Sequence, residues 1–163
     1  MKHQIQITVN GRQHHLVVDS QRTLLEVVRD ELKLFGARES CGMSLCGACT
    51  VLVDDAPVSS CSYLAARADG KSILTIEGLG TPESLHPVQR AFLERDGLQC
   101  SYCTPGMMLM TVCLLKENPS PTVEEIKEYL SGNLCRCTAY PEIIESVLEA
   151  AGLVANEQSR TRE

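Results

Sequence analysis

Residues 41–55, CGMSLCGACTVLVDD, place three cysteines directly before an apolar run that has the length of a short buried strand. The cysteines are spaced C-x4-C-x2-C, and a fourth, Cys61, follows after eleven residues. Glycines at 36, 42 and 47 allow the main chain to curl closely around a group of thiols. The stretch therefore predicts a loop in which several thiolates converge and which is anchored on a sheet.

The spacing of these cysteines also indicates what the thiolates hold. Cys41, Cys46 and Cys49 match the spacing of plant-type [2Fe–2S] proteins. A cluster with four thiolates is anionic and needs backbone N–H donors nearby, which a tightly curled loop supplies. Cys61 comes from a separate segment, so we expect it to fix the loop to the sheet. Structural zinc remains an alternative, although the spacing favours it less here than in the second set below.

The segments around this loop predict a small mixed sheet packed against one helix. Ile5, Ile7 and Val9 alternate with polar residues, as in a half-buried strand, and Asn10-Gly11 is a hairpin turn signal. Thr23 and Glu26 have the spacing of a helix-capping box. The predicted elements are strands at 3–9, 15–19, 49–55, 57–61 and 71–79 and a helix at 23–32.

After residue 78 the pattern becomes helical. Thr122 and Glu125 form a second capping box, and Pro141 suits a first helical turn. Predicted helices lie at 87–97, 105–118, 122–132 and 140–152. We therefore expect an α+β chain of two domains, 1–78 mostly β and 79–154 helical, followed by a polar tail at 155–163.

A second set of four cysteines lies in the helical part. Cys100 and Cys103 precede one predicted helix, and Cys135 and Cys137 lie between the last two, in GNLCRCTAY. If these helices pack side by side, the pattern C-x2-C-x31-C-x-C forms a second four-thiolate site. Helix N-termini near Cys103 and Cys137 would face it with their positive ends. Zinc remains an alternative for this set too, because C-x2-C pairs are common in structural zinc sites.

Composition and charge exclude several classes of function. The net charge of −6 argues against nucleic acid or an anionic membrane surface as partner. The longest apolar run, 107–115, is too short for a membrane span, and the start lacks a secretory apolar region. We expect a cytoplasmic protein, where thiols stay reduced and nine cysteines indicate metal rather than disulfides.

The remaining polar and sulfur-bearing residues carry no chemistry of their own in this interpretation. Cys113 and the methionines at 107, 108 and 110 lie in a helical run and are expected in the core. The four histidines are isolated or face opposite ways and are not expected as ligands. No nucleophile–base pair, phosphate loop or acid–base carboxylate pair is evident, so we expect no catalytic residue on this chain.

Taken together, CGMSLCGACTVLVDD, QCSYCTPGMM and GNLCRCTAY resemble the small iron–sulfur subunit of the molybdenum hydroxylases, the xanthine-oxidase-like enzymes. The resemblance extends from about residue 3 to residue 152. It implies a β-grasp ferredoxin-like domain with one [2Fe–2S] cluster, followed by an all-α four-helix domain with a second, buried cluster.

The resemblance also implies partners and further contact residues. A large subunit would carry molybdopterin and the substrate, and a medium subunit would carry FAD, in a hetero-oligomer such as a dimer of heterotrimers. Gln99 matches a glutamine that hydrogen-bonds the pterin, and Cys137 matches a ligand that lies beside it. Two positions depart from the family pattern, since Ser44 and Ala139 stand where glycine is usual.

These observations support one principal function and two alternatives. The chain is expected to be the electron-transfer subunit of a molybdenum hydroxylase, an oxidoreductase, passing electrons from molybdopterin through two [2Fe–2S] clusters to FAD or another acceptor. The alternatives are a free-standing ferredoxin-like carrier and a zinc-stabilised interaction module. The second thiol set favours the first over the free-standing carrier, which needs only one cluster.

Overall fold

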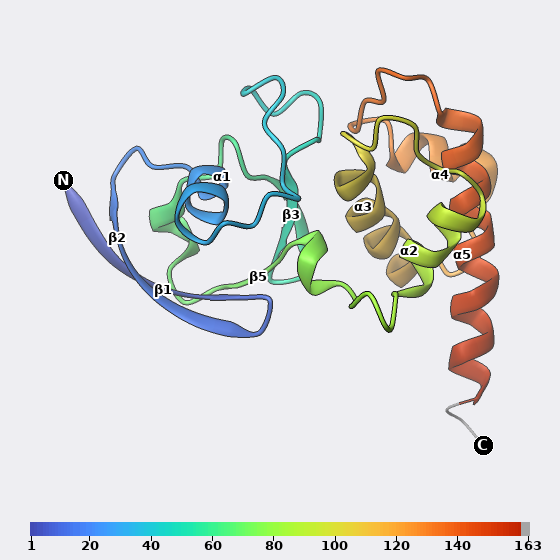
Figure 1. Cartoon of the computed structure of the whole chain (residues 1–163), viewed down its shortest axis with the longest axis horizontal. Helices are drawn as coiled ribbons and strands as arrows, with labels where there is room; N and C mark the ends of the chain where they lie inside the picture. The colour runs from blue at the N-terminus through green and yellow to red at the C-terminus, as the bar shows by residue number, and fades with distance from the viewer. Residues whose placement is uncertain (161–163) are drawn as a thin grey trace.

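The computed structural model describes the backbone of residues 1–160 and the side chains of residues 1–152. The chain forms a β-rich N-terminal region and a helical C-terminal region that lie side by side (Figure 1). The polar tail expected at 155–163 lies beyond the described side chains. Its backbone up to residue 160 continues the last helix.

The N-terminal region is built on a mixed sheet of five strands in the order β2-β1-β5-β3-β4. The first two strands pair antiparallel around the Asn10-Gly11 turn, in which both residues have positive φ. β1 and β5 pair parallel, which makes the sheet mixed. The strands are β1 (Lys2–Val9), β2 (Arg12–Asp19), β3 (Thr50–Val53), β4 (Ala56–Ser59) and β5 (Ser72–Leu74).

One helical segment covers the sheet, as expected from the pattern at 23–32. It begins as α1 (Leu24–Glu26) and continues as a wider π-helical turn, η1 (Val27–Glu31). The capping box is confirmed, because Thr23 Oγ1 accepts the Glu26 N–H and Glu26 accepts the Thr23 N–H. The change to a wider turn was not predicted. It leaves two successive valines, Val27 and Val28, fully buried in the sheet-side core.

Two short 3₁₀ helices complete this region. The first, η2 (Ala65–Ala68), was not predicted, and both of its end alanines are fully buried. The second, η3 (Ile76–Gly78), follows β5 at residues where the predicted strand would have continued. A turn-rich link then leads to the helices, which confirms the change of pattern after residue 78.

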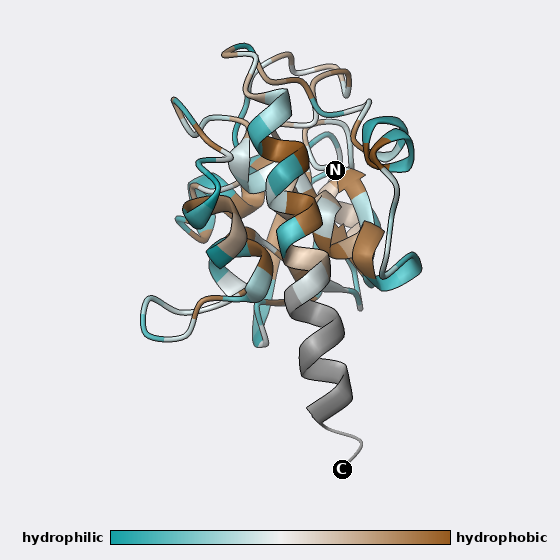
Figure 2. Cartoon of the chain, turned by 90° about the vertical axis from the view of Figure 1, so that its right-hand side faces the viewer, coloured by the Kyte–Doolittle hydropathy of each residue, from teal (hydrophilic) through white to brown (hydrophobic). Residues whose placement is uncertain are grey.

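The C-terminal region contains four α-helices, as predicted: α2 (Pro87–Glu94), α3 (Thr104–Glu117), α4 (Val123–Tyr129) and α5 (Tyr140–Arg160). The Thr122–Glu125 capping box is confirmed at the start of α4. Polar and apolar residues alternate along the first turns of α5 (Figure 2), and its apolar residues join a core with α2 and α3. No helix in the described part of the chain is long and apolar enough to cross a membrane.

The two regions have separate cores and a small third one between them. Buried residues of the sheet and of α1 form the first core, and buried residues of α2 to α5 form the second. A third cluster joins Leu52 of β3 to Leu109 and Cys113 of α3. Cys113 is 4% exposed, which confirms its expected core position. α3 therefore packs against both the sheet and the other helices.

Candidate metal centres

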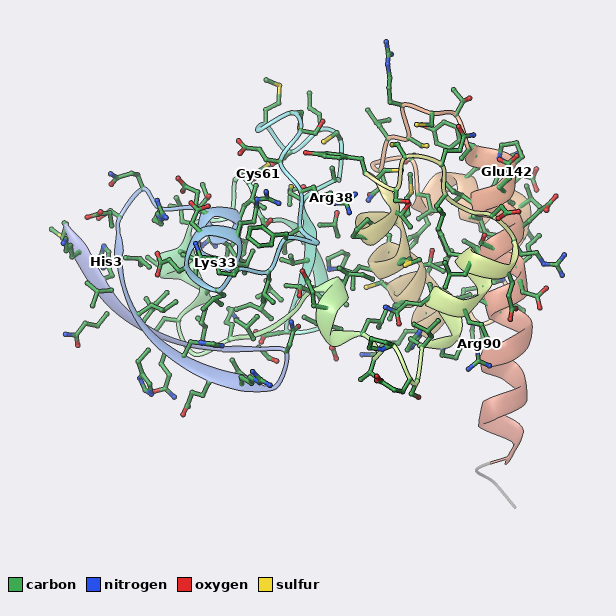
Figure 3. All side chains as sticks on the ribbon, viewed as in Figure 1. His3, Lys33, Arg38, Cys61, Arg90 and Glu142 are labelled. Atoms are coloured by element: carbon green, nitrogen blue, oxygen red, sulfur yellow. The ribbon has the colours of Figure 1, made fainter. Side chains whose placement is uncertain are left out.

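The first thiol set lies at one end of the sheet. Cys41 and Cys46 are in the loop between η1 and β3, Cys49 directly precedes β3, and Cys61 lies in the turn after β4. Figure 3 labels Cys61 on this side of the sheet, near the junction with the helical region. The sheet therefore brings the separate segment of Cys61 to the loop, as the sequence predicted.

The loop is shaped by an alternation of left-handed backbone. Gly42, Ser44 and Gly47 have φ of 65°, 61° and 67°. The N–H groups of the residues between them point inward, so Met43 N–H and Leu45 N–H both donate to Cys41 Sγ at 3.4 Å. Ser44 is strained here because it carries a side chain at a φ that glycine adopts freely.

These donors change the acidity of the thiol that they contact. The N–H groups of Met43 and Leu45 lower the pKa of Cys41 to about 7, and a contact with the Cys46 thiol adds to this effect. Cys49 lies at the other, buried end of the set, where burial raises its pKa to about 11 and the Cys61 thiol lies against it. The four thiols thus meet as two pairs, Cys41 with Cys46 and Cys49 with Cys61.

The second thiol set is assembled from two helix junctions. Cys100 and Cys103 precede α3, and Cys135 and Cys137 lie between α4 and α5. The Cys100 thiol contacts the Cys137 thiol, and Tyr102 N–H is the main group that lowers the pKa of Cys100. Burial raises the pKa of Cys103 to about 12, and its thiol contacts Cys135. The structure therefore brings together all four thiols that the sequence grouped, again in two pairs.

The pairing distinguishes between the two kinds of metal site considered. A structural zinc ion takes four ligands at one centre, with each sulfur about 2.3 Å from the metal. In each set the thiols contact one another two by two, Cys41 with Cys46 and Cys49 with Cys61 in the first, and Cys100 with Cys137 and Cys103 with Cys135 in the second. Two thiols at each of two neighbouring positions instead suit a binuclear [2Fe–2S] cluster, in which each iron is held by two protein ligands.

The start of α3 supplies a second observation that fits a bound cluster. Cys103 is the N-cap residue, so the positive end of the helix lies at the thiol set. Thr104, the next residue, is 5% exposed. Its Oγ1 has no hydrogen-bond partner among the described residues. A buried hydroxyl without a partner costs about 1–3 kcal/mol, so an acceptor beyond the chain's own atoms suits this position.

The two thiol sets are joined directly through the main chain. Leu134 N–H donates to Cys46 O at 2.9 Å, and the neighbouring residue of Leu134 is Cys135. Asn133 Nδ2 donates to Gly47 O at 3.2 Å. A cavity of about 400 Å³ lies between the two loops and is lined by thiols of both sets. This junction was not predicted, because the sequence GNLC does not indicate which distant carbonyl groups its N–H groups contact.

Three further residues that the sequence singled out lie outside the two thiol sets. Gln99 is exposed and directly precedes Cys100. Cys113 lies apart from both sets, with its Sγ 3.7 Å from Asp55 O. Ala139 is buried in the helical core and has no positive φ, so its methyl group is accommodated without backbone strain.

Comparison with known families and structures agrees with this geometry. Residues 7–75 match the 2Fe-2S iron-sulfur cluster binding domain, and residues 75–148 match the [2Fe-2S] binding domain. Each match contains one of the two thiol sets. The chain thus carries two [2Fe–2S]-binding regions, as the sequence predicted.

Relatives align over nearly the whole chain. The small subunit of nicotine 6-hydroxylase from Paenarthrobacter nicotinovorans is 48% identical over 153 residues, covering 94% of this chain and 92% of that one. The iron-sulfur-binding subunit of aldehyde oxidoreductase from Escherichia coli K12 is 43% identical and covers 90% of this chain and 70% of its own length.

Solved structures agree as well. A chain of quinoline 2-oxidoreductase from Pseudomonas putida 86 superimposes with a TM-score of 0.90 at 38% identity, covering 95% of this chain and 97% of that one. The ferredoxin-like arrangement followed by helices is therefore confirmed. This protein belongs to the family of small [2Fe–2S] iron–sulfur subunits of the molybdenum hydroxylases.

Proposed function

We propose that this chain passes electrons inside a hetero-oligomeric molybdenum hydroxylase, from a large molybdopterin-binding subunit to an FAD-binding subunit or another acceptor. The observation that carries the proposal is the contact between the two thiol sets, in which Leu134 N–H binds Cys46 O. A [2Fe–2S] cluster, when bound, supplies a one-electron redox centre. The residues between the sets hold the two centres at a fixed separation, which a relay requires.

We further propose which residues hold the clusters. In the N-terminal set, Cys41 and Cys46 would hold one iron and Cys49 and Cys61 the other. In the helical set, Cys100 and Cys137 would hold one iron and Cys103 and Cys135 the other. The thiol contacts within each pair support this division. The N–H groups of Met43 and Leu45 would stabilise the negative charge on the Cys41 sulfur.

The surface around both thiol sets suits contact with a large partner. Five large apolar side chains are well exposed here: Met43, Leu45, Tyr102, Leu134 and Tyr140. Exposed apolar groups gathered in one place mark a protein interface. We propose that this face binds the large subunit, with Gln99 and Cys137 nearest its pterin.

The division of the chain and its location belong to the same proposal. The two separate cores support one domain at 1–78 and a second domain that begins at residue 79. All nine cysteines are free, which suits the reducing cytoplasm. The named relatives act on substrates as different as nicotine and aldehydes. We therefore place substrate selection on the large subunit.

The proposal is tested by purifying the tagged chain from its native host without oxygen and under mild conditions. We expect a larger complex that contains molybdenum and flavin, with about four iron atoms per copy of this chain. Addition of dithionite should produce paramagnetic signals from two different clusters. A chain that carries the iron but has no larger partner would favour the free-standing carrier. Zinc without iron would favour the interaction module.

A further inference from the structure

Arg38 lies where the two thiol-bearing loops meet. Figure 3 labels it at the junction between the N-terminal region and α3. Its backbone N–H donates to Ala48 O at 3.0 Å, inside the first loop. Its guanidinium Nη1 reaches across to Ser101 O, the carbonyl that directly follows Cys100. Arg38 thus contacts both thiol-bearing loops. It lies three positions before Cys41 in the sequence, and its guanidinium contacts Ser101, the residue after Cys100.

The contact between these segments is reciprocal. The Arg38 guanidinium lies over the Tyr102 ring, 5.3 Å from its centroid. Tyr102 in turn donates its hydroxyl hydrogen to Glu39 O. An arginine combines a planar fork of N–H donors with stacking on an aromatic face, which lysine does not reproduce. The guanidinium is therefore held in place from two sides rather than free to move in solvent.

The charge of Arg38 is not neutralised by a neighbouring carboxylate. Within residues 1–152, no Asp or Glu oxygen lies within 4.0 Å of its guanidinium, whereas Arg22 and Arg95 both form ion pairs. Arg38 is also half-buried, so its field is screened less than that of a fully exposed cation. A positive charge that is fixed, unpaired and next to a thiol set acts mainly on the charge held there.

We propose that Arg38 sets the reduction potential of the cluster held by Cys100, Cys103, Cys135 and Cys137. This inference rests on the proposed function, since it requires that this thiol set binds a redox cluster. One-electron reduction adds a negative charge to the cluster. The fixed guanidinium stabilises that added charge and thereby raises the potential. Net charge and hydrogen bonding near a cluster are known determinants of its potential.

The test is a redox titration of the purified complex, followed by paramagnetic resonance, with Arg38→Gln compared with the unaltered chain. Cys135→Ser identifies the signal that belongs to the helical set. We expect Arg38→Gln to disfavour reduction of this cluster about tenfold, which is a fall of about 59 mV for a one-electron couple. The cluster of the N-terminal set should shift less.

Two further variants separate charge from shape. Arg38→Lys keeps the positive charge but loses the fork and much of the stacking, so it should restore most of the potential. Arg90→Gln removes a positive charge from an exposed arginine of α2, which Figure 3 shows well away from Arg38, and should leave both potentials unchanged. If Arg38→Gln fails to retain iron, Arg38→Met provides the same loss of charge with an apolar stem for the Tyr102 ring.

The outcomes are distinct. A change of less than twofold in Arg38→Gln or Arg38→Met would overturn the inference. An equal shift in Arg38→Lys and Arg38→Gln would overturn it as well, because the charge would then not be the cause. Failure of the proposed function has a different signature, namely an unaltered chain without iron or without a second reducible cluster.

Discussion

The two thiol sets bring four cysteines together in opposite ways. The first takes three of its four cysteines from nine consecutive residues, 41–49, and curls them together with left-handed backbone at Gly42, Ser44 and Gly47. The second takes two pairs from junctions that are 31 residues apart in the sequence. It therefore exists only where α3 packs beside the segment between α4 and α5. One site is encoded locally, and the other depends on tertiary structure.

Within this difference the sites share one arrangement. Each has a thiol toward the surface with a lowered pKa, Cys41 or Cys100, and the main cause is the N–H group two residues further on. Each also has a thiol whose pKa is raised by burial, to about 11 for Cys49 and to about 12 for Cys103. Both sets therefore extend from the surface into a core. This arrangement gives a buried centre one edge that a partner can approach.

The largest expected effect comes from removing one ligand of each set. Cys61→Ser should abolish the cluster of the N-terminal set, and Cys137→Ser that of the helical set, because serine is a poor ligand for this kind of iron centre. Each variant should retain about two of about four iron atoms per chain, and Cys137→Ser should slow flavin reduction in the complex. Iron analysis and resonance spectra provide the measurement.

Cys113→Ser is the matched control for these variants. Its thiol is buried outside both sets, so about four iron atoms and both signals should remain. Loss of both clusters from either ligand variant would show that the two sites do not form independently. Normal spectra and turnover in Cys137→Ser would refute its assignment as a ligand.

A smaller effect is expected at the close approach between the loops. A Cβ at Gly106 in α3 would lie 2.4 Å from Gly47 O, a backbone atom that has little freedom to move. Gly106→Ala should therefore push α3 away from the first loop and cost about 1–3 kcal/mol. Because only the second site depends on the position of α3, its cluster should be released first.

The measurement is the rate of iron release in the presence of a chelator, together with the apparent midpoint of thermal unfolding. Gly132→Ala is the matched control, since a Cβ there would meet nothing within 4 Å and the φ is not positive. Equal release from the two sites in Gly106→Ala would contradict the contrast between local and tertiary assembly.

Asn133→Ala should have a milder effect on the same junction. The side chain is buried and donates to Gly47 O at 3.2 Å, but this carbonyl also accepts from the N–H and hydroxyl of Thr50. No buried carbonyl is left unsatisfied, so the loss should be about 1 kcal/mol. The unfolding midpoint measures it, with Asn118→Ala at an α3 end as control. A loss as large as in Gly106→Ala would show that Asn133 does more than bind Gly47.

The smallest effects should come from relieving strained backbone at two serines, one between Cys41 and Cys46 and one between Cys100 and Cys103. Ser44 and Ser101 both have φ of 61°. Ser101→Gly should stabilise the segment that carries Cys100 and Cys103 by up to about 1 kcal/mol. Ser44→Gly should gain less, because its hydroxyl contacts Ser62 Oγ and lies 4.0 Å from Cys61 Sγ. Iron-release rates rank the two variants, and a larger gain at Ser44 would contradict the role of its hydroxyl.

The sequence predicted what depends on short stretches of chain. The Asn10-Gly11 hairpin, both Thr–Glu capping boxes and the helix after Cys103 follow from local propensity, and the structure contains them. The grouping of Cys135 with Cys103 was also predicted, but only on the assumption that their helices pack together. The π-helical turn at Val27–Glu31 was not predicted. A short apolar stretch is compatible both with α-helical hydrogen bonds and with the wider π-helical ones, so the sequence does not distinguish them.

The junction between the loops could not be predicted for a different reason. Asn133 and Gly47 are 86 positions apart, and Arg38 and Ser101 are 63 apart. Their contacts depend on where the completed sheet and helices place the chain. An asparagine or arginine at such a position has the same sequence signature as one that faces solvent.

The small apolar cluster of Leu52, Leu109 and Cys113, with the Lys116–Asp55 ion pair at its edge, has a consequence for attempts to recombine this protein. A ferredoxin-like region from another source, joined to these helices, would keep this contact only if its third strand carried an apolar residue opposite Leu109 and Cys113 and the following turn carried an acidic group opposite Lys116. A chimera without them would lose part of the packing that positions α3 against the sheet, and with it part of what sets the distance between the two thiol sets.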